Sequence, residues 1–233
     1  NASDFAVMIP ALFDITFICN EVGLTGGLED VDITMDGITV TSGPNGIALF
    51  EDYDLTEKHT VLIQGTGGVS IFALQLAKSI GAKVIATSSS DEKIKKLKTL
   101  GADYCINYKQ NSKWSEEVLS YTKGQGVDHV IEVGGPETLG ESINSVKVGG
   151  HISVIGILSG LQGNLDFVNA LLKQVTLQGV LVGSRSHQER MIAYINQVKF
   201  FPIIDRVFEL EDIVSAFQYQ ESNQHFGKIC LKI

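Results

Sequence analysis

A glycine-rich hexapeptide carries the clearest chemical signal in the sequence. It reads Gly65-Thr66-Gly67-Gly68-Val69-Ser70 and follows a short, β-branched, apolar run at 60–64. A glycine in the first position allows a tight turn, and Gly67 has no side chain to block the approach of a diphosphate. The helix expected next would offer its free N–H groups and its positive dipole end to that anion. We therefore predict a dinucleotide-binding turn. Ser70 replaces the third glycine of the G-x-G-x-x-G pattern and is small enough for close packing between helix and strand. The alternative interpretation of the hexapeptide is a tight strand–helix turn that binds no ligand.

The end of the second expected strand bears on which dinucleotide is bound. An NAD-preferring site places Asp or Glu there, about 20 residues after the turn, to bind the ribose 2′-hydroxyl. This chain has Thr87-Ser88-Ser89-Ser90 instead, and no carboxylate appears before Asp91. Small hydroxyls leave room for a 2′-phosphate, and Lys93 can supply the opposing charge. The sequence thus favours NADP, with NAD the less favoured cofactor. The alternative is that these residues bind no phosphate, so that Ser90 is only a helix cap and the lysines of the next helix form a solvated face.

Alternating strand and helix patterns position these residues. Strands are expected at 60–64, 83–87, 104–107, 127–133, 151–156 and 175–182, and helices at 69–80, 91–100, 114–122, 138–146 and 166–173. Glycine-containing turns, such as Gly149-Gly150, fall between them. This alternation is typical of the α/β class, and we predict a doubly wound, parallel, six-stranded Rossmann sheet. A helix at 189–198, a strand at 205–210, a helix at 211–220 and a strand at 228–233 form a C-terminal α/β appendage.

Charge and hydropathy exclude several classes of protein. The net charge is −9, and residues 1–55 contain acidic residues but no Lys or Arg. Nucleic-acid binders are normally basic, so no nucleic-acid partner is expected. The longest apolar run, at 5–19, is too short to cross a bilayer, so we expect no membrane association and a cytoplasmic location. Within the irregular N-terminal segment, residues 31–41 indicate a β-hairpin with Asp36-Gly37 as its turn.

Several segments at the expected strand ends match a known family as a set. They are ALFEDYDL (48–55), VLIQGTGGVSIFALQLAKSIGAKVIATSSSDEK (61–93), LGADYCINY (100–108), GVDHVIEVGG (126–135), GGHISVIGILSG (149–160) and HFGKICLKI (225–233). The stretch from Ile47 onward resembles the medium-chain dehydrogenase/reductase superfamily, in its zinc-type alcohol dehydrogenase-like and quinone oxidoreductase-like branches. The resemblance implies hydride transfer between NADPH and a carbonyl, a quinone or an activated alkene, with a small-molecule substrate.

The resemblance also assigns residues to parts of the cofactor. The residues implied to bind the diphosphate are Gly65, Thr66, Gly67, Gly68 and Val69. Those implied to bind the 2′-phosphate are Ser88, Lys93 and Tyr108. Those implied to line the ribose and nicotinamide are Val133, Gly134, Ile155, Gly156 and Ile157. Ligands of such sheets lie at the carboxyl ends of the strands, which supports the last group independently. The alternative for Tyr108 and the three apolar members of that group is plain core packing. Relatives often dimerise along the sheet edge near 175–182, so a homodimer is expected by analogy.

The chain departs from the family in its first part. The family's N-terminal catalytic domain, which includes a Gly-His-Glu element in zinc-dependent members, is mostly absent here. The three cysteines (Cys19, Cys105 and Cys230) and five histidines show no spacing typical of a zinc site, so no metal is expected. The thiols of Cys105 and Cys230 are interpreted as buried, and His129 and His151 as strand-start residues. Only His225 stays a candidate near the site, while Lys228 lies either near the phosphates or on an edge strand.

Three regions and three competing functions follow. We expect an acidic N-terminal segment at 1–46, a dinucleotide-binding domain at 47–204 and a remnant of the catalytic domain at 205–233. The leading hypothesis is an NADPH-dependent, zinc-independent oxidoreductase, with no residue identified as an acid–base catalyst. The second is a non-catalytic NADP(H)-binding module or truncated pseudo-enzyme. A methyltransferase is third, since that class usually needs an acidic residue where this chain has Thr87-Ser88.

Overall fold

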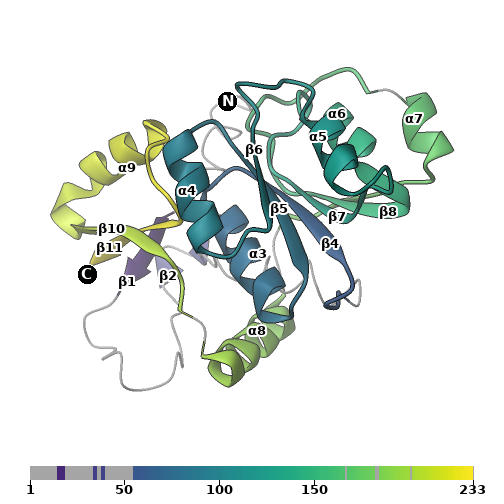
Figure 1. Cartoon of the computed structure of the whole chain (residues 1–233). Coiled ribbons are helices and arrows are strands. Elements are labelled where there is room, and N and C mark those ends of the chain that lie inside the picture. Colours follow the sequence, from purple (N-terminus) through teal and green to yellow (C-terminus); the bar gives the residue numbers. More distant parts are fainter. Residues whose placement is uncertain are drawn as a thin grey trace. The chain divides into compact units, whose positions relative to one another are not determined.

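The computed structural model describes residues 15–18, 34–35, 38–39, 55–165, 167–181, 184–199 and 201–232 (Figure 1). The chain divides into two compact units. The first, here the sheet unit, comprises residues 49–66 and 73–181. The second, here the terminal unit, comprises residues 1–48, 67–72 and 182–233.

The sheet unit is built on six parallel strands. They are β4 (Thr60–Gln64), β5 (Lys83–Ser88), β6 (Tyr104–Asn107), β7 (Val127–Glu132), β8 (Val146–Val154) and β9 (Thr176–Gly179). Their order is β6-β5-β4-β7-β8-β9, with every neighbouring pair parallel. This is the doubly wound order predicted from the sequence, and the expected fold class is confirmed.

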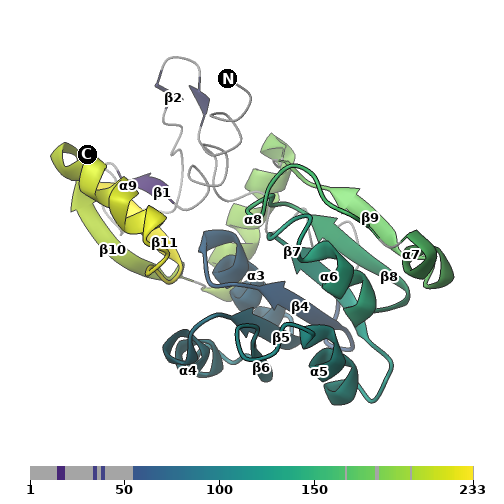
Figure 2. The ribbon, with the colours of Figure 1, turned by 90° about the horizontal axis from the view of Figure 1, so that it is seen from above.

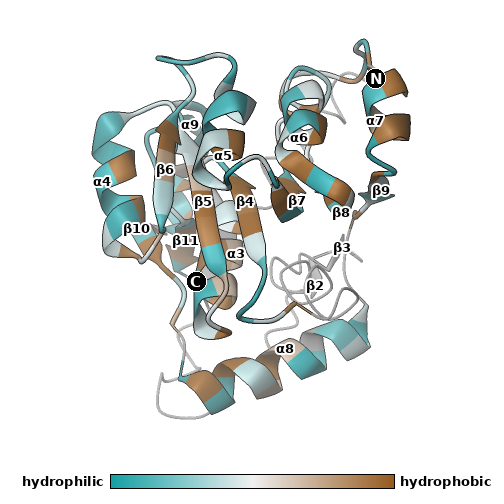
Figure 3. Ribbon diagram, turned by 45° about the vertical axis from the view of Figure 1, so that its right-hand side comes forward, coloured by the Kyte–Doolittle hydropathy of each residue, from teal (hydrophilic) through white to brown (hydrophobic). Residues whose placement is uncertain are grey.

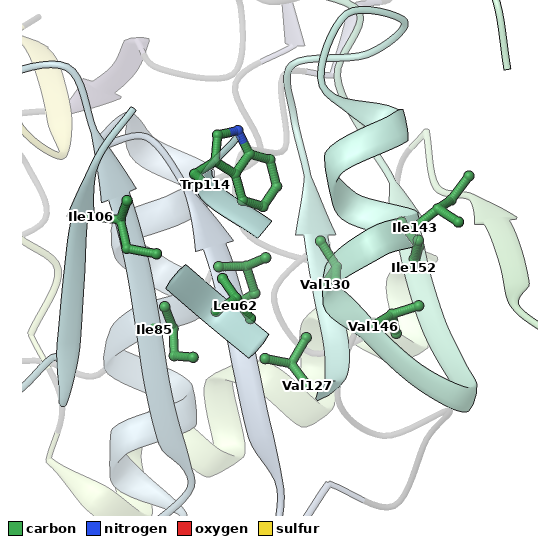
Figure 4. Packing of buried hydrophobic residues seen from close by; sticks show 10 residues of the cluster. Leu62, Ile85, Ile106, Trp114, Val127, Val130, Ile143, Val146 and Ile152 are labelled. Atoms are coloured by element: carbon green, nitrogen blue, oxygen red, sulfur yellow. The ribbon is translucent and has the colours of Figure 1, made fainter. Parts of the chain in front are cut away.

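Buried aliphatic side chains hold the helices to this sheet. Leu62, Ile85 and Ile152 project from three strands onto one face, where Trp114 and Ile143 meet them (Figure 4). Trp114 begins α5 (Trp114–Tyr121), and Ile143 lies in α6 (Leu139–Ser145). Burial of one such aliphatic side chain contributes about 1.5–3 kcal/mol. Helix α3 (Gly68–Ser79) belongs to the sheet unit from Ala73 onward, and this part covers the opposite face (Figure 2), as right-handed crossovers require.

The remaining helices of the sheet unit differ in how they are stabilised. Helix α4 (Asp91–Thr99) has acidic residues in its first turn and lysines in its last, which suits its dipole. The predicted Ser90 cap is confirmed, because its side chain accepts the Lys93 N–H. Helix α7 (Phe167–Leu172), in contrast, exposes most of its hydrophobic residues (Figure 3).

Two sequence-based boundaries are wrong for identifiable reasons. Strand β8 begins at Val146, not His151, and includes the glycine pair expected to be a turn. Its register against β7 shifts between Val127 and His129, so the glycines lie in a bulge within the strand. Helix α8 (Arg185–Val198) begins four positions before the expected Glu189, because Ser184 and His187 form a capping box there.

The terminal unit contains the C-terminal α/β appendage. It holds β10 (Ile204–Glu209), the short 3-10 helix η1 (Leu210–Asp212), α9 (Ile213–Glu221) and β11 (Lys228–Lys232). Strand β11 lies between β10 and β1 (Ile15–Ile18), parallel to both. A small core gathers Ala216, Ile229 and Leu231.

The hairpin expected at 31–41 is confirmed by its strands. Strand β2 (Thr34–Met35) pairs antiparallel with β3 (Ile38–Thr39), and Met35 lies opposite Ile38. The predicted turn residues, 36 and 37, lie outside the described residues. Among the helices described, none is long and apolar enough to cross a membrane.

Candidate functional site

The glycine turn lies between the central strand and the first helix of the sheet. Gly65 follows β4 with φ +74°, a conformation that strongly favours glycine. Its N–H donates to the Thr87 carbonyl at the end of β5, 3.0 Å away. A Cβ atom added to Gly65 would meet nothing within 4 Å, so the space beside the backbone is open. The chain then enters α3 at Gly68, and the first N–H groups of a helix have no acceptor within it.

This turn lies at the switch point of the sheet. After β4 the chain runs outward to β5 and β6, and it then returns to β7 on the other side of β4. The carboxyl ends of β4 and β7, Gln64 and Glu132, are therefore neighbours at the point where open α/β sheets bind ligands.

The three residues predicted to bind a 2′-phosphate come from adjoining elements. Ser88 ends β5, Lys93 lies in the first turn of α4, and Tyr108 follows β6. The Tyr108 N–H donates to the Ser88 carbonyl, at 3.1 Å, and the Ser88 hydroxyl accepts the Ser90 N–H, at 3.3 Å. Ser88 is buried, Lys93 is half-buried, and the Tyr108 side chain is 41% exposed, which argues against plain core packing for Tyr108.

A carboxylate that the sequence prediction left aside lies beside this group. Asp91 accepts a hydrogen bond from Asn107 Nδ2, at 2.7 Å, and one from Gln110 Nε2, at 3.3 Å. Both donors follow or end β6, so the acidic group is held toward that strand. Its charge also suits the N-terminus of α4.

The residues predicted to face the ribose and nicotinamide come together at the ends of β7 and β8. Val133, Gly134, Ile155, Gly156 and Ile157 are all half-buried. The Ile155 and Gly156 N–H groups donate to the Glu132 carbonyl, at 2.8 and 3.2 Å. A Cβ atom on Gly156 would lie 2.0 Å from the Val133 carbonyl oxygen, so only glycine allows the two loops to pack this closely.

Glu132 itself was missed by the sequence prediction. Its side chain is fully buried at the switch point, and it accepts hydrogen bonds from backbone N–H groups and from side chains of β4 and α6. The available signal was an acidic residue that directly follows the apolar pair Val130-Ile131 at the end of the strand. Buried acids are rare unless they are paired or hydrogen-bonded.

Comparison with known proteins assigns the family. The profile described as zinc-binding dehydrogenase matches residues 68–197, which is more than half of the chain. The chain belongs to the zinc-binding dehydrogenase family. The resemblance to the medium-chain dehydrogenase/reductase superfamily is thereby confirmed.

Individual relatives and solved structures agree with this assignment. A zinc-type alcohol dehydrogenase-like protein of Schizosaccharomyces pombe is 42% identical over 81% of this chain and 56% of its own length. An NAD-dependent alcohol dehydrogenase structure matches with a TM-score of 0.75 and 29% identity, over 83% of this chain and 57% of that one. A mycobacterial protein solved with NADPH matches with a TM-score of 0.70 and 25% identity, over 80% and 61%. The chain spans about half the length of the curated relatives it matches.

The metal ligands of a zinc-binding dehydrogenase are not assembled in the part of the chain that is described. No group of three His, Cys, Asp or Glu side chains there could hold a metal ion. Burial raises the pKa of the Cys105 and Cys230 thiols to about 11, so both are protonated at neutral pH. Cys230 is buried and Cys105 half-buried, whereas Cys19 lies outside the described residues.

Two histidines of the sheet unit pack inside it, away from the carboxyl ends of the strands. His129 and His151 are buried within β7 and β8, rather than at the strand starts, and both contact the Ser153 hydroxyl, at 2.9 and 3.2 Å. Burial, and for His129 the neighbouring His151, lower their pKa values to about 3 and 4. Both rings are therefore neutral and structural.

The two C-terminal candidates lie in the terminal unit. His225 is buried, and its ring lies 6.5 Å from that of Tyr219. Lys228 is also buried and begins β11, which is a central strand between β1 and β10. The alternative of a lysine on an edge strand is therefore wrong. Whether either residue approaches a cofactor stays a prediction.

Proposed function

We propose that this chain is the dinucleotide-binding part of an NADP(H)-dependent oxidoreductase that transfers a hydride to or from a carbonyl, a quinone or an enone. The observation that carries the proposal is the Gly65 turn, with its left-handed backbone and open space at the switch point of the sheet. The coenzyme, when bound, supplies the hydride chemistry, and the chain binds and orients it.

We propose that three sets of residues bind three parts of the coenzyme. The turn and the first amides of α3 bind the diphosphate through Gly65, Thr66, Gly67, Gly68 and Val69. Ser88, Lys93 and Tyr108 bind the adenosine 2′-phosphate. Val133, Gly134, Ile155, Gly156 and Ile157 form the wall against which the ribose and nicotinamide lie. Support comes from their common position at the carboxyl ends of neighbouring strands.

The preference for NADP rests on the group around Ser88. A hydroxyl ends β5 where NAD-preferring sites have a carboxylate, and Lys93 offers a cation one turn into α4. Relatives use both coenzymes, since one matched structure is of an NAD-dependent alcohol dehydrogenase and another contains NADPH. The choice for this chain therefore depends on its own residues.

Zinc has no role in the proposed chemistry of this chain. The described His, Cys, Asp and Glu side chains do not form a ligand set, so the residues do not fit a catalytic zinc ion. The carbonyl substrate class is supported by the alcohol dehydrogenases among the relatives. Residues 205–233 are proposed to be what this chain holds of the family's catalytic domain.

A second candidate function is a non-catalytic NADP(H)-binding module, such as a pseudo-enzyme. It is favoured by the described cofactor residues themselves, which lie at the strand ends and among which no acid–base catalyst is identified. Such a protein would bind the coenzyme through the same strand ends but would lack the wall that holds a substrate.

Two measurements separate these functions. Calorimetric titration with NADPH and NADH tests binding, and NADPH oxidation is then followed with a panel of aldehydes, quinones and enals. Saturable binding with turnover of any member supports the oxidoreductase. Binding without turnover of any substrate supports the module. Folded protein that binds neither coenzyme contradicts both.

Location and assembly complete the proposal. We expect a cytoplasmic protein that pairs with a second copy along β9, the last strand in the order of the described sheet. Leu177 in β9 is 40% exposed, and the neighbouring helix α7 exposes Phe167 and Leu171 still more. Exposed apolar side chains on an edge strand suit strand addition between copies.

A further inference from the structure

We propose that Glu132 is the positioning residue for the nicotinamide side of the site. The inference rests on the proposed function, because it concerns how the two loops that face the ribose and nicotinamide keep their shape. Glu132 ends β7, its side chain is fully buried, and it lies next to the carboxyl end of β4. Both of its carboxyl oxygens accept hydrogen bonds from groups of the chain, so its action is through the loops.

One carboxylate oxygen fixes the loop after β7. Glu132 Oε1 accepts the N–H groups of Gly134 and Gly135, at 2.8 and 2.9 Å. It also accepts the Thr138 hydroxyl, at 2.6 Å, which ties the loop to the start of α6. Gly135 has φ +89°, so the loop is held in a backbone conformation that few other residues adopt.

The other oxygen connects the loop to the central strand. Glu132 Oε2 accepts Gln64 Nε2, at 2.7 Å, and the Ser142 hydroxyl. The Gln64 amide is oriented by these contacts, since its Nε2 also donates to Ser142. Its Oε1 is thereby turned toward the Val133 and Gly134 N–H groups, 3.3 Å away from each.

The backbone of Glu132 fixes the second loop. Its carbonyl oxygen accepts the N–H groups of Ile155 and Gly156. The second loop is linked back to the first, because Ser159 donates to the Gly134 carbonyl through both its N–H and its hydroxyl, each at 2.8 Å. One residue therefore holds both walls of the predicted nicotinamide side.

The chemistry of the donors explains why a side chain with two acceptor oxygens is needed. All five groups that meet the side chain among the described residues are donors, and a carboxylate is the side chain that accepts from both of its oxygens. Glutamine at this position would turn an N–H₂ group toward donors on one side. The residues around Ser88 make no described hydrogen bond with Glu132, so the adenosine end should be unaffected.

The first experiment compares a whole coenzyme with its adenosine half. Glu132→Gln is titrated calorimetrically with NADPH and with adenosine 2′,5′-bisphosphate, which lacks the nicotinamide. We expect NADPH binding to weaken by about tenfold or more, since charge-assisted hydrogen bonds are lost, and binding of the bisphosphate to change by less than about twofold. Glu141→Gln is the matched control, because Glu141 lies in the same helix as Ser142 but accepts the Ser115 N–H instead.

The second experiment exchanges the carboxylate of Glu132 and the amide of Gln64 between the two positions. In the double variant Gln64→Glu/Glu132→Gln, an amide and a carboxylate again face each other, with the same number of acceptors. We expect it to regain most of the NADPH affinity that the single variant loses. If Glu132→Gln does not fold, the double variant is compared with the unmodified protein and should bind NADPH within about fivefold of it.

The outcomes are distinguishable from failure of the proposed function. Unmodified, folded protein that binds neither ligand would overturn the proposed function and this inference with it. Where the unmodified protein binds both, a Glu132→Gln variant with unchanged NADPH affinity, or with equal losses for both ligands, overturns the role of Glu132 alone. The role of Glu132 is also overturned if a folded double variant binds the bisphosphate but has not regained NADPH affinity.

Discussion

Lys93 is the side chain on which the choice between the two coenzymes most depends. We predict that Lys93→Ala weakens NADPH binding by about 10- to 100-fold, because a charge-assisted contact with a phosphate contributes about 1.5–3 kcal/mol. NADH has no 2′-phosphate, so its affinity should change by less than about twofold. Calorimetric titration with both coenzymes measures the two effects.

Helix α4 offers a matched control for this test. Lys95 lies on the same helix as Lys93, is exposed and carries the same charge. Lys95→Ala should leave both affinities nearly unchanged, since exposed charges are screened by solvent and salt. Equal losses of NADPH and NADH in Lys93→Ala would remove the 2′-phosphate from its proposed place.

His129 and His151 make stability depend on pH. Burial lowers their pKa values from 6.5 to about 3 and about 4, so the unfolded chain binds more protons than the folded one below about pH 6.5. Their contribution is therefore fully present above that pH and is lost as the pH falls toward the folded values. Between pH 7 and pH 5 we expect a loss of about 2 kcal/mol per histidine.

Urea unfolding at the two pH values measures this loss. The double variant His129→Asn/His151→Asn removes both imidazoles and should show a much smaller difference between pH 7 and pH 5. The explanation is wrong if the unmodified protein has the same free energy of unfolding at both values.

At the scale of elements, a glycine determines how closely the loops that follow β7 and β8 can pack against each other. Gly156→Ala places a methyl group against the Val133 carbonyl, so the loops must separate, and we expect destabilisation by about 1–3 kcal/mol together with weaker NADPH binding. Gly140→Ala is the comparison, because Gly140 lies inside α6 with nothing within 4 Å of the added atom. It should stabilise the protein by about 0.5–1 kcal/mol.

Thermal unfolding and NADPH titration of both variants test this difference. The two substitutions add the same methyl group and should have opposite effects on stability. Similar stability changes in the two variants would show that the contact between the loops is not as close as described.

The elements that sequence patterns predicted best are those with local signals. Strand β4 was expected at its observed limits because a β-branched apolar run meets a glycine turn there, and Ser90 was recognised as a helix cap. The start of β8 was missed because a glycine pair, usually a turn, here forms a bulge. The start of helix α8 was predicted four residues too late because His187, rather than Glu or Gln, completes its capping box.

The network around Glu132 could not be predicted in the same way. Its partners Gln64 and Ser142 are 68 and 10 residues away in sequence, and only the pairing of β4 with β7 brings them together. Sequence spacing does identify the strand ends that face a ligand, but it does not identify which buried polar side chains hold them in place.

At the scale of the whole molecule, the position of β9 at the end of the described sheet predicts self-association. We expect the unmodified protein to be a dimer by light scattering, at about twice the chain mass of 25.2 kDa. Leu177→Lys should make it monomeric, because a charged residue on an edge strand opposes pairing with another strand.

A control for this prediction lies in the terminal unit. Val214 in α9 is 65% exposed, and Val214→Lys should leave the dimer intact. A monomeric unmodified protein, or a dimer insensitive to Leu177→Lys, would exclude the edge of β9 as the interface.

The central claim is that the backbone amides at the beginning of α3 bind the diphosphate of a nicotinamide dinucleotide. Backbone amide NMR spectra recorded during a titration with NADPH test it most directly. We predict saturable shifts that are largest at Gly65, Thr66, Gly67, Gly68 and Val69. Folded protein whose amide signals do not move, or which binds NADPH while these five amides stay unchanged, would contradict the claim.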